Sequence, residues 1–108
     1  MTGSPDRAVD YIIKHGKLFA EAKAHRIYIE EYRKSLKALI MSKSRESSVA
    51  AQEREAYSHD QYIDHLKALE QAVAAEETLR WGLVAAQARI DVWRSMEASN
   101  RQEVRATM

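Results

Sequence analysis

The chain has 108 residues, with 17 lysines and arginines against 16 aspartates and glutamates, and it has no cysteine. This is the length of one domain, and the absence of cysteine excludes a disulfide scaffold, a thiolate nucleophile and a cysteine-based metal site. No apolar run is long enough to span a membrane and the first residues lack the apolar segment of a signal peptide, so we expect a cytoplasmic protein with no membrane partner. The formal net charge of +1 gives no general attraction to nucleic acid or lipid.

A first helix is predicted over residues 5–42. Pro5 is the only proline in the chain, and it suits the first turn of a helix, with Ser4 before it as the N-cap. The polar residues 43–48 have the composition of a loop. The first helix is therefore expected to end at this linker.

A short linking helix and a second long helix are predicted after the linker. Residues 49–57 are rich in helix-forming residues. Ser58 and Gln61 form a capping box, and a helix is expected from there over residues 58–99. Residues 100–108 carry charges without an apolar period, so we expect this tail to fray.

Apolar residues recur in both long segments at alternating spacings of three and four, which is the pattern of a coiled-coil seam. The expected seam of the first helix is Tyr11, His15, Leu18, Ala22, His25, Ile29, Tyr32, Leu36 and Leu39. That of the second begins with Tyr62, Leu66, Leu69 and Val73, shifts in phase, and continues with Leu79, Leu83, Ala86, Ile90 and Trp93.

The fold class predicted from these elements is all-α: a long antiparallel helical hairpin with one short linking helix, in a single domain of residues 1–108. If the hairpin folds near residue 49, Gly16 and Gly82 lie at the same level. Two facing glycines would let the backbones approach closely or make room for Trp81; the alternative is that their match is a coincidence.

The segment 79–93 is apolar on two opposite faces. When Leu79 is placed at 0° and each residue advances about 100°, its seam lies within about 40° of Leu79 and a second stripe lies between about 140° and 220°. One partner helix covers only one stripe, and an exposed apolar stripe marks an interface. We therefore expect a homodimer that forms a four-helix bundle or coiled coil. The expected oligomer interface consists of Trp81, Val84, Ala88, Val92 and Trp93. The alternative is that the first helix bends, or that residues 49–57 fold back, over the second stripe.

No group of residues predicts catalysis or metal binding. His15 and His25 are ten residues apart, roughly 15 Å along a helix, which is too far to share a metal. The polar residues of 59–65 are better explained by capping and surface exposure. There is no H-E-x-x-H motif, no nucleophile motif and no phosphate-binding glycine loop. We expect no enzymatic activity, no cofactor and no metal.

Five cations near the predicted turn are the candidate nucleic-acid contacts. They are Arg33, Lys34, Lys37, Lys43 and Arg45, with no acidic residue between Glu31 and Glu46. Such a cluster can contact phosphates without reading sequence. The alternative is that these cations lie at a helix C-terminus because the helix dipole favours them there.

Three strings are similar to a group of small, largely uncharacterised proteins of tailed bacteriophages and prophages. The strings are EYRKSLKAL at residues 31–39, AQEREAY at 51–57 and LRWGLVAAQARIDVWRSMEASNR at 79–101. The resemblance covers residues 28–101, and its most distinctive part is the ending Trp-Arg-Ser…Ala-Ser-Asn-Arg. It implies a phage-derived protein in the cytoplasm of a bacterial host, from gene blocks that include DNA recombination or replication, and it assigns no residue a task.

The expected function is that of a non-enzymatic, oligomeric helical adaptor of phage or prophage origin. Its partners would be a second copy of itself and a phage or host protein, in accessory work for phage DNA recombination or replication. Two alternatives remain open. One is a direct, sequence-independent nucleic-acid binder that uses the basic cluster, and the other is an inhibitor of a host defence or metabolic protein.

Overall fold

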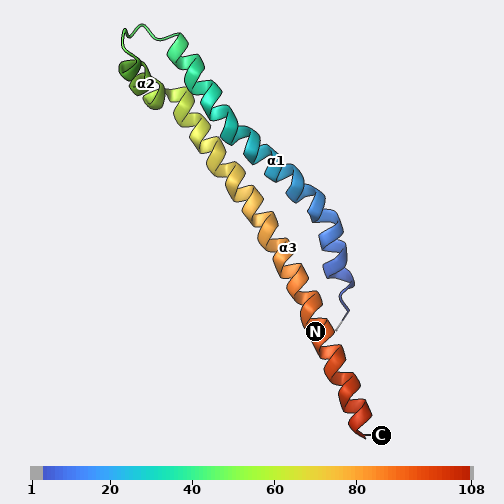
Figure 1. Cartoon of the computed structure of the whole chain (residues 1–108). Helices are drawn as coiled ribbons and strands as arrows, with labels where there is room; N and C mark the ends of the chain where they lie inside the picture. The colour runs from blue at the N-terminus through green and yellow to red at the C-terminus, as the bar shows by residue number, and fades with distance from the viewer. Residues whose placement is uncertain (1–3, 108) are drawn as a thin grey trace. The chain divides into compact units, whose positions relative to one another are not determined.

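The computed structural model describes residues 4–107, and these residues form three helices and no strand (Figure 1). The helices are α1 (Asp6–Ser42), α2 (Val49–Ser58) and α3 (Asp60–Thr107). The predicted all-α class is confirmed. In the part of the chain that is described, none of the helices has a stretch that is both long and apolar enough to cross a membrane.

Serine side chains cap the starts of α1 and α2. The Ser4 hydroxyl accepts a hydrogen bond from the backbone N–H of Asp6 at 3.3 Å, in the position predicted for the N-cap before Pro5. Ser48, in extended backbone conformation, accepts from the backbone N–H of Ala51 at 3.1 Å. Each cap satisfies one of the N–H groups that have no partner within the first turn of a helix.

The start of α3 differs from the predicted capping box. Ser58 is the last residue of α2, and its hydroxyl donates to the carbonyl of Arg54 at 2.8 Å. His59 separates the two helices, and its Nδ1 accepts from the backbone N–H of Gln61 at 3.1 Å. The prediction was wrong because a serine hydroxyl in the last turn of a helix is attracted to the carbonyl four residues earlier, which leaves the imidazole to cap α3.

The end of α3 also differs from the prediction of a frayed tail over residues 100–108. The helix continues to Thr107, whose hydroxyl donates to the carbonyl of Val104 at 3.0 Å, while Met108 lies outside the described residues. No glycine or proline follows Gly82, and the alanine, arginine, glutamine and glutamate of this stretch favour helix. Because residues 98–107 are all exposed, helix propensity rather than packing supports this final part.

The contacts divide the chain into two units, and the single domain stays a prediction. The turn unit consists of residues 21–76, and the terminal unit consists of residues 4–20 with residues 77–107. Within the turn unit the chain follows α1, turns through residues 43–48 and returns through α2 and α3, so this unit is an antiparallel helical hairpin (Figure 1). Its core contains Ile40, Ala56 and Tyr62, with Leu36 and Met41 packed against them.

Within the terminal unit, α1 and α3 also run antiparallel. The guanidinium of Arg80 lies over the ring of Phe19 at 5.6 Å, whereas residues 4–8 lie beside Arg89 and Trp93. Ala8 and Ala86 are buried, at 5% and 4% exposure. Small residues therefore occupy the most buried positions of both helices, which allows the two helices to approach closely.

Gly16 and Gly82 do not face each other in the terminal unit. A Cβ atom at Gly82 would overlap the hydroxyl of Tyr11, whereas no neighbouring atom lies within 4 Å of the Cβ position at Gly16. The proposed close approach of two glycines is therefore wrong. Gly82 instead makes room for an aromatic side chain of α1, and Gly16 borders open space.

The less exposed face of α1 is shifted from the predicted seam at every second position. His15, Ala22, Ile29 and Leu36 lie on this face as predicted. The exposed residues are Leu18, His25, Tyr32 and Leu39, and the residues that take their places are Phe19, Arg26, Arg33 and Ile40. Positions three and four residues after a seam residue border it equally well. The prediction chose the first set because three of its four members are apolar. The second set contains two arginines, which are not expected at seam positions.

Candidate functional site

The second apolar stripe of α3 is exposed. Trp81 is 63% exposed, Val84 48% and Val92 53%, and Ala88 is also exposed. The opposite side of the helix, which faces α1, is buried or half-buried from Leu79 to Ile90. Residues 49–57 pack within the turn unit through Ala56, which is 0% exposed.

The stripe is part of a broader surface without charge, which we call the α3 face. Its eight members are all exposed: Trp81, Val84, Ala85, Ala88, Val92, Ser95, Met96 and Ser99. At about 100° per residue they cover an arc of about 120° on the side away from α1, and at 1.5 Å per residue the arc is about 27 Å long. Four of the eight are alanine or serine, so a second helix could approach the backbone closely here.

Trp93, the fifth residue predicted at the interface, does not lie on the α3 face. It is half-buried and lines a hollow of about 640 Å³ with Arg89 and residues 4–8. On the helix wheel Trp93 lies with the seam residues, which face α1. The same rotation of about 100° per residue places Trp81 on the exposed stripe. The two tryptophans therefore belong to opposite sides of α3.

Charged residues of both signs border one edge of the α3 face. Arg80 Nε lies 3.2 Å from Glu77 Oε1, and Arg94 Nη1 lies 4.0 Å from Asp91 Oδ1, with all four side chains at least 46% exposed. On the opposite edge, between residues 78 and 99, the one charged residue is Arg89. The two edges thus differ in charge: at about 100° per residue, Arg80 and Asp91 lie just outside the arc on one edge, whereas the other edge has only Arg89 in this range.

The turn unit brings together three of the five predicted nucleic-acid contacts. A hollow of about 360 Å³, which we call the basic hollow, is lined by Arg33, Lys34, Lys37, Tyr57 and Tyr62. Lys43 lies apart from it on another hollow, and Arg45 is exposed in the loop. The predicted run of five cations is thus three clustered residues and two separate ones.

Acidic residues neutralise part of the charge of the basic hollow. Lys37 Nζ lies 3.7 Å from Glu53 Oε1 and 4.7 Å from the centre of the Tyr57 ring. Its interaction with Tyr57, and to a smaller extent the charge of Glu53, raise the pKa of Lys37. Lys34 Nζ lies 3.3 Å from Glu31 Oε2. Two of the three cations therefore already have an anionic neighbour.

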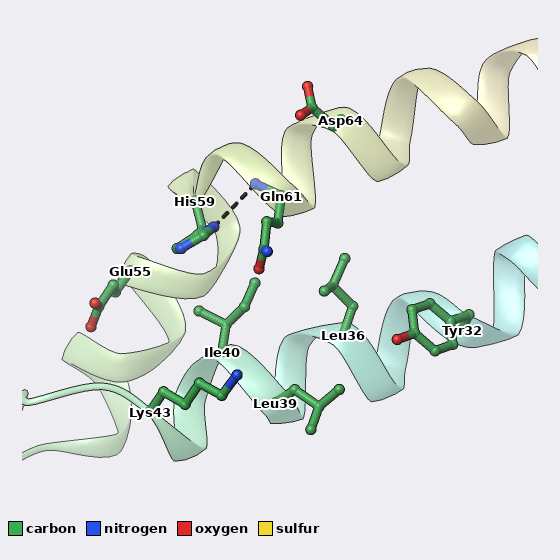
Figure 2. A pocket seen from close by; sticks show the side chains of 9 residues that line it. All are labelled: Tyr32, Leu36, Leu39, Ile40, Lys43, Glu55, His59, Gln61 and Asp64. Atoms are coloured by element: carbon green, nitrogen blue, oxygen red, sulfur yellow. Dashed lines mark hydrogen bonds between the residues drawn. The ribbon is translucent and has the colours of Figure 1, made fainter.

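A second hollow of the turn unit, of about 500 Å³, lies where the end of α1 meets α2 and the start of α3. It is lined by Tyr32, Leu36, Leu39, Ile40, Lys43, Glu55, His59, Gln61 and Asp64 (Figure 2). Leu36 and Ile40 extend from α1 toward Gln61, whereas the carboxylates of Glu55 and Asp64 point in different directions (Figure 2). Because these carboxylates diverge, the hollow offers apolar contact and not a pair of carboxylates that could act on one substrate.

Three of the four histidines have structural partners. The Nδ1–H of His15 donates to the carbonyl of Tyr11 at 3.0 Å, and the Nε2–H of His65 donates to the carbonyl of Ile29 at 2.6 Å. His59 caps α3. Within residues 4–107, no three histidine, aspartate or glutamate side chains are close enough together to hold a metal ion.

An ion pair between α1 and α3 in the turn unit was not predicted from the sequence. Glu76 is 2% exposed, and Arg26 binds both of its oxygens while a third guanidinium nitrogen lies 2.7 Å from Glu30. The hydrogen bond with Glu76, followed by that with Glu30, raises the pKa of Arg26. A signal was available, since Glu76 lies four residues after Ala72 and three before Leu79, which is seam spacing.

Two surfaces therefore have chemistry suited to a partner: the uncharged α3 face in the terminal unit and the basic hollow in the turn unit. Their residues are exposed or half-buried, apart from the buried Tyr62. Comparisons of the chain with protein-family models, with curated proteins and with solved structures found no match.

Proposed function

We propose that the protein is a non-enzymatic helical adaptor that works as a homodimer joined through the α3 face. The observation that supports this most directly is the 63% exposure of Trp81 within an arc that has no charge from residue 81 to residue 99. Burial of apolar surface contributes about 25 cal/mol per Å², and a continuous exposed apolar surface is typical of an interface. Pairing of two copies would assemble four long helix segments, with each α3 between its own α1 and the other α3.

We further propose a setting for this adaptor. The resemblance of residues 28–101 to small phage and prophage proteins suggests accessory work in phage DNA recombination or replication in a bacterial cell. A homodimer carries two turn units, and each has the apolar hollow of Figure 2 and the basic hollow. Two copies of each surface would let the dimer bind two partner molecules, which is what an adaptor does.

The test of self-association is sedimentation of the protein over a wide concentration range. We expect the parent chain to form dimers, and we expect Trp81→Ala and Val84→Asp to shift it to monomers while helical circular dichroism is retained. The matched control is Val49→Asp, because Val49 is 65% exposed but lies on α2, so this variant should still dimerise. A parent protein that remains monomeric at high concentration would contradict the proposal.

A second candidate function is direct, sequence-independent binding of nucleic acid. The observation that favours it is the basic hollow, where three cations adjoin the exposed ring of Tyr57, because cations contact phosphates and aromatic rings stack on bases. The test is titration of labelled single- and double-stranded DNA at several salt concentrations. Binding that weakens with salt and is lost in Arg33→Glu supports this candidate, and no binding at low salt eliminates it.

A further inference from the structure

We infer that the two copies pair along the α3 face in antiparallel orientation, with Arg80 opposite Asp91 of the partner subunit. This inference rests on the proposed homodimer and specifies how the second copy binds. It is carried by the charges that border one edge of the face, by the small residues within the face and by the position of Trp81.

The charged edge is complementary to itself. In a two-fold antiparallel pair of helices, each edge of the contact face meets the same edge of the other copy. Arg80 and Asp91 have their midpoint between residues 85 and 86. The register with this midpoint therefore places Arg80 of each copy opposite Asp91 of the other.

A parallel pair would lose this complementarity. In a parallel two-fold pair, the charged edge meets the opposite edge, on which Arg89 is the one charge between residues 78 and 99. Arg80 and Arg94 would then have no acid of the other copy within reach. Like or unmatched charges across an interface disfavour that orientation, whereas complementary charges select the orientation and register.

The apolar residues of the α3 face fit the same register. In the register centred between residues 85 and 86, the Trp81 indole lies at the same height along the helix axis as Ala88 and Val92 of the partner subunit. Both of these residues are exposed in the single chain. Ala85 lies beside its own counterpart near the two-fold axis. A large side chain therefore meets small ones, and alanines at the centre allow the two helices to approach closely.

The ion pairs present in one copy are compatible with this arrangement. Glu77 with Arg80, at 3.2 Å, and Asp91 with Arg94, at 4.0 Å, are pairs within a single α3. In the antiparallel register, the Asp91 carboxylate of one copy lies at the level of Arg80 of the other, so this arginine gains a second acid beside Glu77. Exposed ion pairs add little affinity one by one, so these groups select the orientation while the apolar residues supply the attraction.

Single cysteines test the orientation, because the chain has none of its own. In the proposed register, the two copies of residue 85 are about 1.5 Å apart along the helix axis and the two copies of residue 99 about 40 Å apart. Ala85→Cys should therefore form a disulfide-linked dimer under mild oxidation, and Ser99→Cys should not. In a parallel pair, Ser99→Cys would cross-link to itself readily.

A charge exchange tests the register. Arg80→Glu should weaken dimerisation about five- to tenfold, and Arg80→Glu combined with Asp91→Arg should restore it. The matched control is Arg89→Glu, which makes the same change of charge on the edge without acids and should have little effect. All variants are compared by sedimentation, with circular dichroism to verify that they fold.

The outcomes separate this inference from the proposed function. Cross-linking of Ser99→Cys, absence of cross-linking of Ala85→Cys, or failure of the exchanged charges to restore binding, in a protein that sediments as a dimer, overturns the antiparallel register and leaves the homodimer standing. A parent protein that sediments as a monomer overturns both.

Discussion

Arg26 of α1 binds both carboxylate oxygens of Glu76 of α3, at 2.7 and 3.1 Å. Glu76 is 2% exposed, and a buried carboxylate is costly unless it is paired and hydrogen-bonded. The pair therefore restricts which residues of α1 and α3 can lie opposite each other in the turn unit. Glu76 occupies a seam position that an apolar residue would otherwise fill.

Removal of Arg26 alone should destabilise the protein more than removal of the pair. We expect Arg26→Met to lower the Tm by about 5 °C or more, because it removes both hydrogen bonds that Arg26 makes with the buried Glu76 carboxylate. Arg26→Met combined with Glu76→Leu should recover most of the loss, since an apolar pair can replace a buried ion pair. Thermal unfolding followed by circular dichroism checks both.

The control for this experiment is Lys34→Met. Lys34 pairs with Glu31 at 3.3 Å, with side chains 74% and 66% exposed, and exposed pairs contribute little. We expect almost no change in Tm for this variant. If Arg26→Met combined with Glu76→Leu is no more stable than Arg26→Met alone, the expectation that an apolar pair can replace this ion pair is contradicted.

The two helical glycines should respond in opposite directions to alanine. Gly16→Ala should raise the free energy of unfolding by up to about 1 kcal/mol, because its Cβ enters open space. Gly82→Ala should lower it despite the same gain in helix propensity, because its Cβ overlaps the hydroxyl of Tyr11, whose ring is stacked on His15 with centroids 3.7 Å apart. Urea unfolding measures both, and Tyr11→Phe should reduce the loss at Gly82.

The charge of Lys37 should stabilise the fold up to alkaline pH. Tyr57 and, less strongly, Glu53 raise the pKa of Lys37 above 10.5. Since the folded-state pKa is the higher one, this stabilisation is fully present below about pH 10.5 and is lost as the pH rises through the raised value. The difference in Tm between the parent and Lys37→Met should therefore decrease between pH 9 and pH 12.

The titration of Lys37 can be observed directly by NMR of its side-chain nitrogen. We expect Tyr57→Phe to move its pKa back toward the ordinary value, because Tyr57 is the largest cause of the shift. An unchanged titration in Tyr57→Phe would assign the shift to Glu53 instead.

Charge reversal of the predicted nucleic-acid contacts should separate surface residues from structural ones. Lys43→Glu should change stability by less than about 0.5 kcal/mol, because Lys43 is exposed. Lys37→Glu should be clearly more destabilising, since it places a second carboxylate about where Lys37 now meets Glu53 at 3.7 Å. Equal effects of the two variants in urea unfolding would contradict this difference.

Local chemistry explains why the sequence predicted the helices and the exposure of four interface candidates. The start of α1 follows from Ser4 and Pro5, and the two-faced character of α3 follows from helix periodicity alone. Trp81, Val84, Ala88 and Val92 share one arc of the helix wheel, and all four are exposed. Trp93 was grouped with them although its own position on the wheel lies with the seam, and it is half-buried.

The sequence by itself determined the helical class, most helix bounds and the presence of two apolar faces on α3, because hydrogen bonds within four residues and a fixed helical repeat decide these features. Only the tertiary structure decided that Ile40 and not Leu39 is buried, that Arg26 and Glu76 meet, and that Tyr11 fills the space beside Gly82. Each of these depends on the rotation of one helix against another. That rotation is decided by side chains distant in the chain, and helix periodicity carries no information about it.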